Sequence, residues 1–523
     1  MTTYEIRYHF NKFADLRFES GCMNKVVSNA VLGVLWLGGL AQFASATSLQ
    51  NVNLDQPAFY DNLEASELSI NTNQHIRPFS YRRAEPFLPD LDRLRRFPDK
   101  DSLDEGALWK VAFPSSMNAR VLYTNEEASF LEGQSGLSLR NGANVLAFED
   151  GYINYADEII LYLQLKQVVN QKTMENQLFR GYLKMGFGKW SLELGKDNVS
   201  IGPGEYGGLL LSNNAEPYSL VKLATEEPVN FLGDWDFVFM QAWLNQKRQD
   251  HSNPKLLAAA ASFKPFNWIE LGLVRTELFG GDNRPGYSLT EYPQILLGSG
   301  DNISGDRFDN DGYLSINVSV YFPLQDIFPG VRTFKYYYEE AGSDIAAFWQ
   351  DDPSGSGKKS DFFTLMDVSI MQGLYIATES NIFRLEYAHV TTNFYNNHNY
   401  GVEGYSYNNM ALGYPYGRNT ESYLFKHLHY FSKDMWGQYK IGQYQSPAFH
   451  TQIPGLTMTR SFLEVQAEKK VGIYRLSGFV RLDSTQNYDG TLSSNPIAAI
   501  SDRTVTAEDK TFTTVGVSVT MDF

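Results

Sequence analysis

A polar stretch over residues 195–225 carries side chains well suited to binding a ligand rich in hydroxyl groups. Ser212, Asn213 and Asn214 place one hydroxyl and two amides in succession. These groups donate and accept hydrogen bonds, as recognition of a sugar requires. Ser and Asn also favour turns. We therefore consider two functions for the motif, a platform for sugar hydroxyls and a structural turn that enters or crosses the fold.

Glycine and proline crowd the same stretch. The positions that we expect to shape it are Gly202, Pro203, Gly204, Gly208 and Pro217. Glycine within a strand marks a bend or the close approach of another backbone. We interpret these five residues as the structural part of the motif.

A second candidate segment is the aromatic stretch 393–416. It contains Tyr395, His398, Tyr400 and Tyr405 among several asparagines and glycines. Sugar sites combine aromatic faces with hydrogen-bonding side chains, so we expect these four residues to contact a polysaccharide. The alternative is that the tyrosines belong to an aromatic girdle at a membrane interface.

The residue types that serve catalysis or bind metals do not form a convincing set. Residues 309–312 read Asp-Asn-Asp-Gly, which matches part of a calcium loop, but the remaining ligand spacing is missing. His427 and His429 fall on one face of a predicted strand without a third ligand in the sequence. We therefore predict that the protein is not an enzyme and that it holds no cofactor and no metal.

Composition narrows the class of protein. The chain has 523 residues, a net charge of −16, 14% aromatic residues and one cysteine. The acidic balance argues against nucleic-acid binding, and the single cysteine excludes a disulfide scaffold. Two classes remain compatible with this composition. One is a soluble globular protein, and the other is a transmembrane β-barrel, whose alternating strands average to a polar composition.

The first 46 residues have the features of a signal peptide. Lys25 supplies a positive charge, residues 31–40 are apolar, and residues 44–46 read Ala-Ser-Ala, a typical cleavage site. The signal begins at Met23, which we expect to be the true start of translation. The lone Cys22 precedes that start, so the mature chain is predicted to contain no cysteine.

Residues 47–107 are predicted to form a small helical segment. Apolar residues recur at helical spacing over 59–63 and again over 87–94, and Ser80 suits a helix N-cap. We expect two or three short helices that form a small domain or a plug. An ordered linker is the alternative.

From residue 108 onward the pattern changes to strict alternation. Every even position of 314–322 is apolar, and 159–165 and 474–483 alternate in the same way, with charges of both signs on the second face. Alternation of this kind predicts β-strands with two different environments. At about 9–11 residues per membrane strand, residues 108–523 accommodate roughly 16–18 strands.

The connections and the last strand point to a membrane barrel. Short turns, such as 188–189 and 378–381, alternate with long polar loops, such as 279–312 and 393–421. Outer-membrane barrels show this asymmetry. The final alternating strand ends on Phe523, which we interpret as the signal for barrel assembly. We predict an all-β fold, a transmembrane antiparallel β-barrel in the outer membrane of a Gram-negative bacterium.

The polar stretch resembles the signature of the Wzi-type capsule assembly family of outer-membrane proteins. That signature runs Gly-Pro-Gly, then Gly-x-Leu, then Ser-Asn-Asn-Ala-x-Pro, and this chain matches it over 202–217. Residues 75–79, 337–344 and 385–413 resemble further family segments. Glu216 and Asn408 depart from the family, because basic residues are common at both positions.

The resemblance implies an 18-stranded barrel with a small periplasmic helical segment. It also implies a surface lectin that anchors capsular or other exopolysaccharide, with Glu340 and Asp344 as further ligand candidates. The implied partners are outer-membrane lipids and lipopolysaccharide, the surface polysaccharide and the barrel assembly machinery. Because the two departures remove positive charge, we expect the protein either to bind a neutral glycan or to bind its polysaccharide at a locally basic patch. A porin or a polysaccharide-export channel remains the alternative function.

Overall fold

The computed structural model describes thirteen stretches of the chain. They are residues 49–55, 57–65, 73–84, 108–125, 129–130, 132–170, 173–298, 306–324, 327–347, 363–401, 403–447, 457–487 and 508–522. Residues 47–523 form one compact unit. The predicted signal peptide, the predicted helix over 87–94 and Phe523 lie outside the described residues, so these remain predictions.

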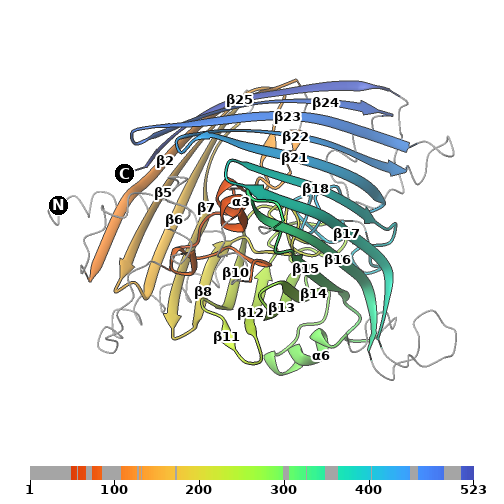
Figure 1. Cartoon of the computed structure of the whole chain (residues 1–523). Coiled ribbons are helices and arrows are strands. Elements are labelled where there is room, and N and C mark those ends of the chain that lie inside the picture. The colour runs from red at the N-terminus through yellow and green to blue at the C-terminus, as the bar shows by residue number, and fades with distance from the viewer. Residues whose placement is uncertain are drawn as a thin grey trace. The chain divides into compact units, whose positions relative to one another are not determined.

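Eighteen strands within the described part of the chain close into an antiparallel barrel, as predicted (Figure 1). They are β2 (Trp109–Thr124), β5 (Gly142–Tyr155), β6 (Ile159–Asn170), β7 (Met174–Phe187), β8 (Trp190–Asp197), β10 (Tyr218–Thr225), β12 (Asp234–Trp243), β13 (Lys255–Phe266), β14 (Ile269–Phe279), β15 (Asp311–Tyr321), β16 (Val331–Ala347), β17 (Phe363–Thr378), β18 (Asn381–Val390), β21 (Thr420–Ser432), β22 (Met435–Pro447), β23 (Thr457–Val471), β24 (Tyr474–Gln486) and β25 (Lys510–Asp522). The short β11 (Val229–Asn230) extends the edge of β12.

Closure occurs where β2 pairs with β25 on one side and with β5 on the other. Val121 lies opposite Val517 in the first pair and opposite Val145 in the second. All three valines are exposed on the outside of the barrel. Closure pairs the backbone groups of the first and last strands, which lipid requires because it offers no hydrogen-bond partners.

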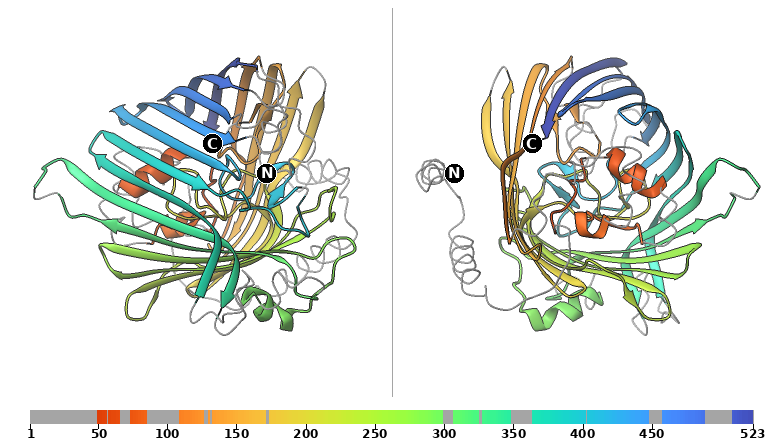
Figure 2. Two further views of the ribbon diagram at one scale, coloured as in Figure 1. Left: turned by 90° about the vertical axis from the view of Figure 1, so that its right-hand side faces the viewer. Right: turned by 60° about the vertical axis from the view of Figure 1, so that its left-hand side comes forward.

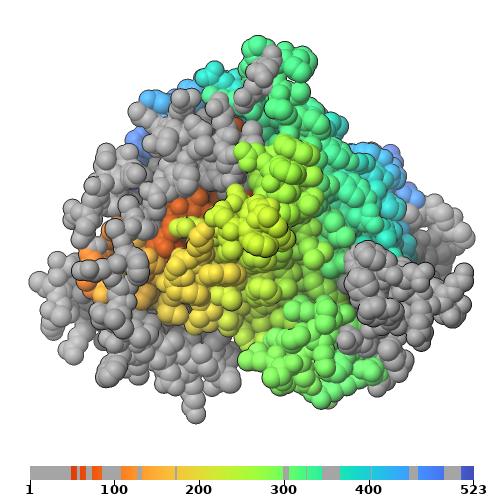
Figure 3. Space-filling view, turned by 60° about the horizontal axis from the view of Figure 1, so that its bottom comes forward, coloured from red at the N-terminus to blue at the C-terminus, as the bar shows by residue number. Residues whose placement is uncertain are grey.

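The alternation predicted from the sequence separates the two faces of the barrel. In β15, Ser315, Asn317 and Ser319 point inward and are fully buried, whereas the outward Ile316 is 44% exposed. The strands from β10 to β16 form a continuous outer wall in the space-filling view (Figure 3). The apolar face is therefore the outer one, and the polar face lines the lumen.

The two ends of the barrel differ. At one end, here called the turn end, two-residue turns join β7 to β8, β17 to β18 and β23 to β24. At the other, here called the loop end, long segments join β14 to β15 and β18 to β21. One of these segments carries a 3₁₀ turn (Leu289–Glu291) and α6 (Tyr292–Leu296). In outer-membrane barrels the short turns face the periplasm.

Part of the predicted helical segment lies inside the ring of strands. We call residues 49–84 the plug. Its described residues include α3 (Pro57–Ala65), β1 (Ile76–Arg77) and α4 (Tyr81–Ala84). Both helices are seen within the barrel from two directions (Figure 2). The Arg83 N–H donates to Ser80 Oγ at 3.0 Å, which confirms the predicted N-cap. None of the described helices is long and apolar enough to cross a membrane.

Candidate functional site

The signature stretch leaves the wall of the barrel and enters the lumen. Residues 198–217, here called the insertion, connect β8 to β10. Within it, β9 (Ser200–Ile201) pairs with β1 of the plug, and Ile201 also bridges to Leu211. A Cβ atom on Gly208 would lie 2.0 Å from the Ile201 carbonyl oxygen, so only glycine fits there. Close backbone approach, as predicted, accounts for the glycine.

The three polar residues of the signature bind other parts of the chain. Ser212 Oγ donates to the Gly413 carbonyl at 2.5 Å, and Asn214 Nδ2 donates to the Ala411 carbonyl at 3.2 Å. Asn213 Nδ2 donates to Asp55 of the plug at 3.0 Å. All three side chains are buried. This geometry favours the structural interpretation of the motif, and sugar contact by these residues stays a prediction.

The same insertion carries a carboxylate into the middle of the lumen. Glu205 lies 2.8 Å from Lys426, 3.0 Å from Lys440 and 3.2 Å from Arg384. Arg384 also donates to the Pro203 carbonyl at 3.2 Å. Gly202 and Gly204 are buried beside Glu205 in the chain, and Pro217 is buried where the insertion meets β10. The signature therefore ties the insertion to strands β18, β21 and β22.

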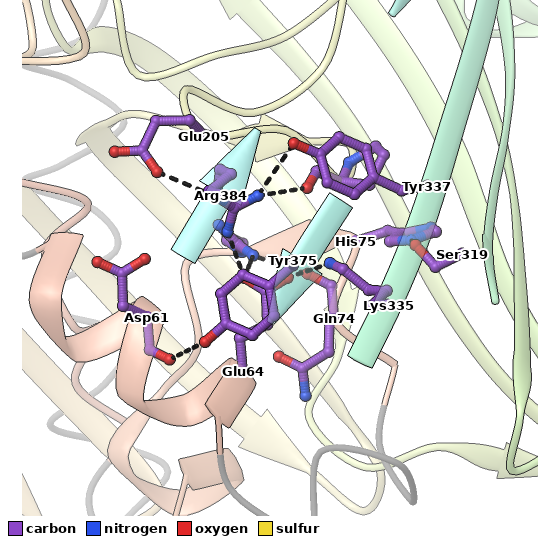
Figure 4. A network of polar contacts seen from close by, with 12 residues as sticks. Asp61, Glu64, Gln74, His75, Glu205, Ser319, Lys335, Tyr337, Tyr375 and Arg384 are labelled. Carbon is purple, nitrogen blue, oxygen red and sulfur yellow. Dashed lines mark hydrogen bonds and ion pairs between the residues drawn. The ribbon is translucent and has the colours of Figure 1, made fainter. Parts of the chain in front are cut away.

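A second carboxylate reaches this network from the plug (Figure 4). Glu64 on α3 accepts hydrogen bonds from Lys335 and from Arg384, the latter at 2.7 Å, and lies 3.8 Å from Arg77. Burial alone would raise the pKa of Glu64, but the three cations lower it to about 2. The carboxylate is therefore ionised throughout the physiological range, and it holds α3 against β16 and β18.

His75 anchors the other side of the plug. Its ring Nε2 lies 2.7 Å from Ser319 Oγ, and its backbone N–H donates to Glu270 at 3.0 Å. Burial lowers the pKa of His75 to about 4, although the negative charge of Glu270 opposes that shift. The imidazole is therefore neutral at pH 7, and its 3.5 Å contact with Glu270 is not an ion pair at that pH.

Two cations on the inner face of β7 take part in similar contacts. Arg180 lies 2.8 Å from Asp55 of the plug and 3.3 Å from Asp197, while Lys184 lies 2.7 Å from Glu226. The partner carboxylates were not predicted individually. Their signal in the sequence was the recurrence of acidic residues on the polar face of the alternating strands.

The aromatic stretch forms a buried layer at the loop end. Tyr395, Tyr400 and Tyr405 are all 0% exposed. Tyr395 stacks on Tyr405 with ring centroids 5.7 Å apart, and its hydroxyl donates to the Leu209 carbonyl. Within this stretch, β19 (Ser406–Tyr407) pairs with β20 (Met410–Ala411). The tyrosines pack the loop onto the insertion, and their contact with a polysaccharide stays a prediction.

Polar side chains cover this layer from outside. We call His251, Arg284, His398 and Asn399 the loop-end platform. The His251 ring and the Arg284 guanidinium each lie 5.8 Å from the Tyr400 ring. Arg284 donates to Asn399 Oδ1 at 2.9 Å. The His398 side chain is 49% exposed and lies 2.8 Å from Asp309. Of these four, only His398 was predicted from the sequence; the other three carry no local signal.

Other named positions lie elsewhere. Glu340 faces outward on β16, where it accepts a hydrogen bond from Tyr338 at 2.8 Å. Its inward neighbour Glu339 accepts from the Leu209 N–H at 3.0 Å. Asp344 belongs to the same strand, and its side chain lies outside the described part of the structure. The structure does not bring Glu340 to the platform.

The remaining candidates do not form a metal centre. His427 and His429 point outward on β21, and both contact Asn381 Oδ1, at 3.0 and 2.8 Å. Within the described residues, no group of three or more potential His, Cys, Asp or Glu ligands comes together. Asn408 donates to Glu216 at 2.8 Å, which joins the two positions that depart from the family pattern.

Comparisons with known proteins agree with this geometry. The family model of the capsule assembly protein Wzi matches residues 112–439. No curated protein sequence gives a significant match. Wzi of Escherichia coli, described as an outer membrane protein involved in group 1 capsule assembly and as a carbohydrate-binding β-barrel, is similar in structure. That similarity has a TM-score of 0.62 and 14% identity, and covers 90% of this chain and 99% of that one.

Two barrels of Pseudomonas aeruginosa, OpdQ and OprD, are more distant. Each similarity has a TM-score of 0.45 and covers 79% of this chain. It covers 98% of OpdQ, at 10% identity, and 95% of OprD, at 9% identity. The fold is that of an outer-membrane β-barrel, and the outer membrane is where this protein resides. Because the family model covers more than half of the chain, this protein belongs to the Wzi capsule assembly family.

Proposed function

We propose that this protein is a non-catalytic surface lectin that binds capsular or exopolysaccharide at the loop-end platform. One observation carries the proposal. His251, Arg284, His398 and Asn399 lie over the buried Tyr400 layer, at the end of the barrel where the long loops lie. Tyr400 Oη donates to the Gly280 carbonyl at 2.9 Å, which fixes the layer beneath them. Binding groups on a rigid base lose little conformational entropy when a polymer docks.

The charges of the platform favour a neutral or weakly charged glycan. Arg284 is cationic, but the Asp309 carboxylate lies 2.8 Å from His398 and adds a negative charge beside it. Glu216 and Asn408, at the positions where relatives carry basic residues, add no cation. Together with the overall negative charge, this balance does not favour a strongly acidic polymer.

The filled lumen supports a lectin over a channel. The plug, the insertion and the buried tyrosines form three successive layers, joined by Asp55–Asn213 and Ser212–Gly413 contacts. Purified protein in planar bilayers should therefore show no large, steady conductance. A persistent open current would favour the porin or export-channel alternative.

The outer surface fits a lipid environment. Leucines, valines and aromatic residues point outward on most strands, so we propose that lipids and lipopolysaccharide surround the barrel. We also propose that the barrel assembly machinery inserts it, since its final strand has the expected alternating pattern.

Polysaccharide retention by cells tests the lectin proposal. Cells lacking the protein would be complemented with the wild type, with His398→Ala or with His427→Ala, and the polymer retained on their surface would be quantified. Retention should fall with His398→Ala and stay normal with His427→Ala, because His427 faces outward on β21. Equal retention by both variants would contradict binding at the platform.

A further inference from the structure

The lumen retains a solvent-sized cavity on the side of the barrel where the strands close. It measures about 220 Å³ and lies between the plug and the inner faces of β22–β25, β2 and β5. A single water needs only about 10–15 Å³. We call this cavity the vestibule. It exists because the facing positions of β24 and β25 carry small side chains, among them Ser477, Gly516 and Ser518.

The vestibule opens toward the turn end. Arg475 and Arg481 lie on the same inner face of β24, with Arg475 closer to the turn. The Arg475 side chain is 24% exposed, whereas that of Arg481 is 2% exposed. On the loop-end side of the cavity, Glu132 accepts two hydrogen bonds from Arg481, at 2.5 and 3.0 Å. Among the described residues, the wall of the vestibule is therefore more exposed on the periplasmic side than on the loop-end side.

Two charged groups in its wall form no ion pair with a residue that the structure describes. Arg120 on β2 donates to Asn118 and stacks over Phe148 at 5.2 Å, and it makes no ion pair with any described residue. Asp150 on β5 accepts hydrogen bonds from neutral groups, among them Ser116 and Gln164, each at 2.8 Å. Both retain hydrogen-bonding capacity toward the cavity.

The rest of the wall combines aromatic faces with hydroxyl and amide groups. Phe148, Phe479 and Trp436 border the cavity beside Asn118, Ser518 and Thr520. Cations and carboxylates are nearly balanced in the lining, so the pocket has no strong preference for a charged ligand. Apolar rings beside paired donors and acceptors suit a ligand with apolar faces and many hydroxyls.

We propose that the vestibule is a second saccharide site, which binds a neutral segment of one to three sugar units from the periplasmic side. Arg120 and Asp150 would bind hydroxyl groups, and the rings of Phe479 and Trp436 would pack against sugar faces. This site is separate from the loop-end platform and does not depend on the lectin proposal.

The test uses the full-length protein in detergent micelles with the platform inactivated by His251→Ala and His398→Ala. Neutral trisaccharides (maltotriose, cellotriose and triacetylchitotriose) and neutral fragments from partial hydrolysis of the cell's own surface polysaccharide are titrated by calorimetry. At least one should bind saturably and change the tryptophan fluorescence, and Trp436→Phe should reduce that change. Failure of every probe to bind would overturn the proposal.

Two variants localise the binding. Ser518→Trp fills the vestibule and should abolish binding, whereas Val519→Trp, whose position is 44% exposed on the outer face, should leave it intact. Asp150→Asn keeps the shape and should weaken binding about tenfold, or about 1.4 kcal/mol. Heat-modified gel mobility confirms that each variant is a folded barrel. Unchanged binding in folded Ser518→Trp and Asp150→Asn would overturn the proposal, whatever the platform binds.

Discussion

The Glu64 carboxylate on the plug accepts a hydrogen bond from the Arg384 guanidinium on the barrel wall at 2.7 Å, although the two residues are 320 positions apart. Both side chains are almost fully buried. Lys335 contacts the same carboxylate from β16. One plug residue therefore neutralises cations from two strands of the wall.

Glu64→Gln should loosen the plug. The substitution leaves Arg384 and Lys335 without their shared anion, and loss of one partner in a buried ion pair costs about 3–5 kcal/mol. Hydrogen exchange of residues 57–65 in the full-length protein should accelerate strongly. Glu379→Gln is the control, because Glu379 is 86% exposed and lies 3.8 Å from Arg332. Equal protection in both variants would show that Glu64 does not hold the plug.

Acid should release the plug in two stages. His75 has its pKa lowered from 6.5 to about 4, so a released plug binds more protons than a docked one within that window. The contribution of neutral His75 to the stability of the docked plug is complete above about pH 6.5 and is lost as the pH falls toward 4. Glu64, lowered from 4.5 to about 2, adds a further loss below about pH 4.5.

Proteolysis of the plug across pH 4 to 7.5 measures this loss. Cleavage by an acid-tolerant protease should increase toward pH 4, and His75→Gln should remove most of the change between pH 6.5 and 4. If the wild-type plug resists proteolysis equally at pH 4 and at pH 7.5, acid does not release it.

The sequence predicted the wall of the barrel much better than its contents. Alternation along 314–322 identifies the two faces of β15, because each face meets one uniform environment. The contents depend on contacts between distant segments, such as Asn213 with Asp55, which no local pattern encodes. The short helix over 57–65 was visible as spacing, but its place inside the barrel was only one of the alternatives.

The candidate site shows the same limit. The aromatic stretch was recognised from the sequence. In the structure, however, the hydroxyls of Tyr395 and Tyr400 donate to backbone carbonyls, and the Tyr405 ring stacks on that of Tyr395. A segment rich in tyrosine has the same composition whether its side chains pack a core or bind a sugar. His251 and Arg284 come from two other loops, so only the fold reveals that they cover Tyr400.

Glu132→Ala should make the barrel leak. Arg481 would keep Asp483 but lose the carboxylate that it binds on the loop-end side of the vestibule. Small conductance steps should appear in planar bilayers, where the wild type is silent. Lys510→Ala, at a position 40% exposed, should stay silent and serves as the control. A silent Glu132→Ala variant would mean that other groups seal this end.

Tyr395→Phe should loosen the seal between the aromatic layer and the insertion. The Tyr395 hydroxyl accepts from the Tyr414 N–H at 2.8 Å and donates to the Leu209 carbonyl. Its removal leaves two buried polar groups unpaired, at about 1–3 kcal/mol each. Amide hydrogen exchange at Leu209 and Tyr414 should become faster. The control Tyr336→Phe, on the outer face, should leave the exchange rates at both positions unchanged. Equal exchange in both variants would argue against this role.

Equilibrium binding of the cell's own surface polysaccharide to protein in lipid nanodiscs tests the central claim most directly. The double variant His251→Ala/His398→Ala would be compared with His427→Ala/His429→Ala, which carries the same substitutions on the outward face of β21. Binding should be at least about tenfold weaker, or about 1.4 kcal/mol, for the first variant, and the second should keep wild-type affinity. Wild-type affinity in both would contradict the claim that this barrel holds its polysaccharide at the loop-end platform.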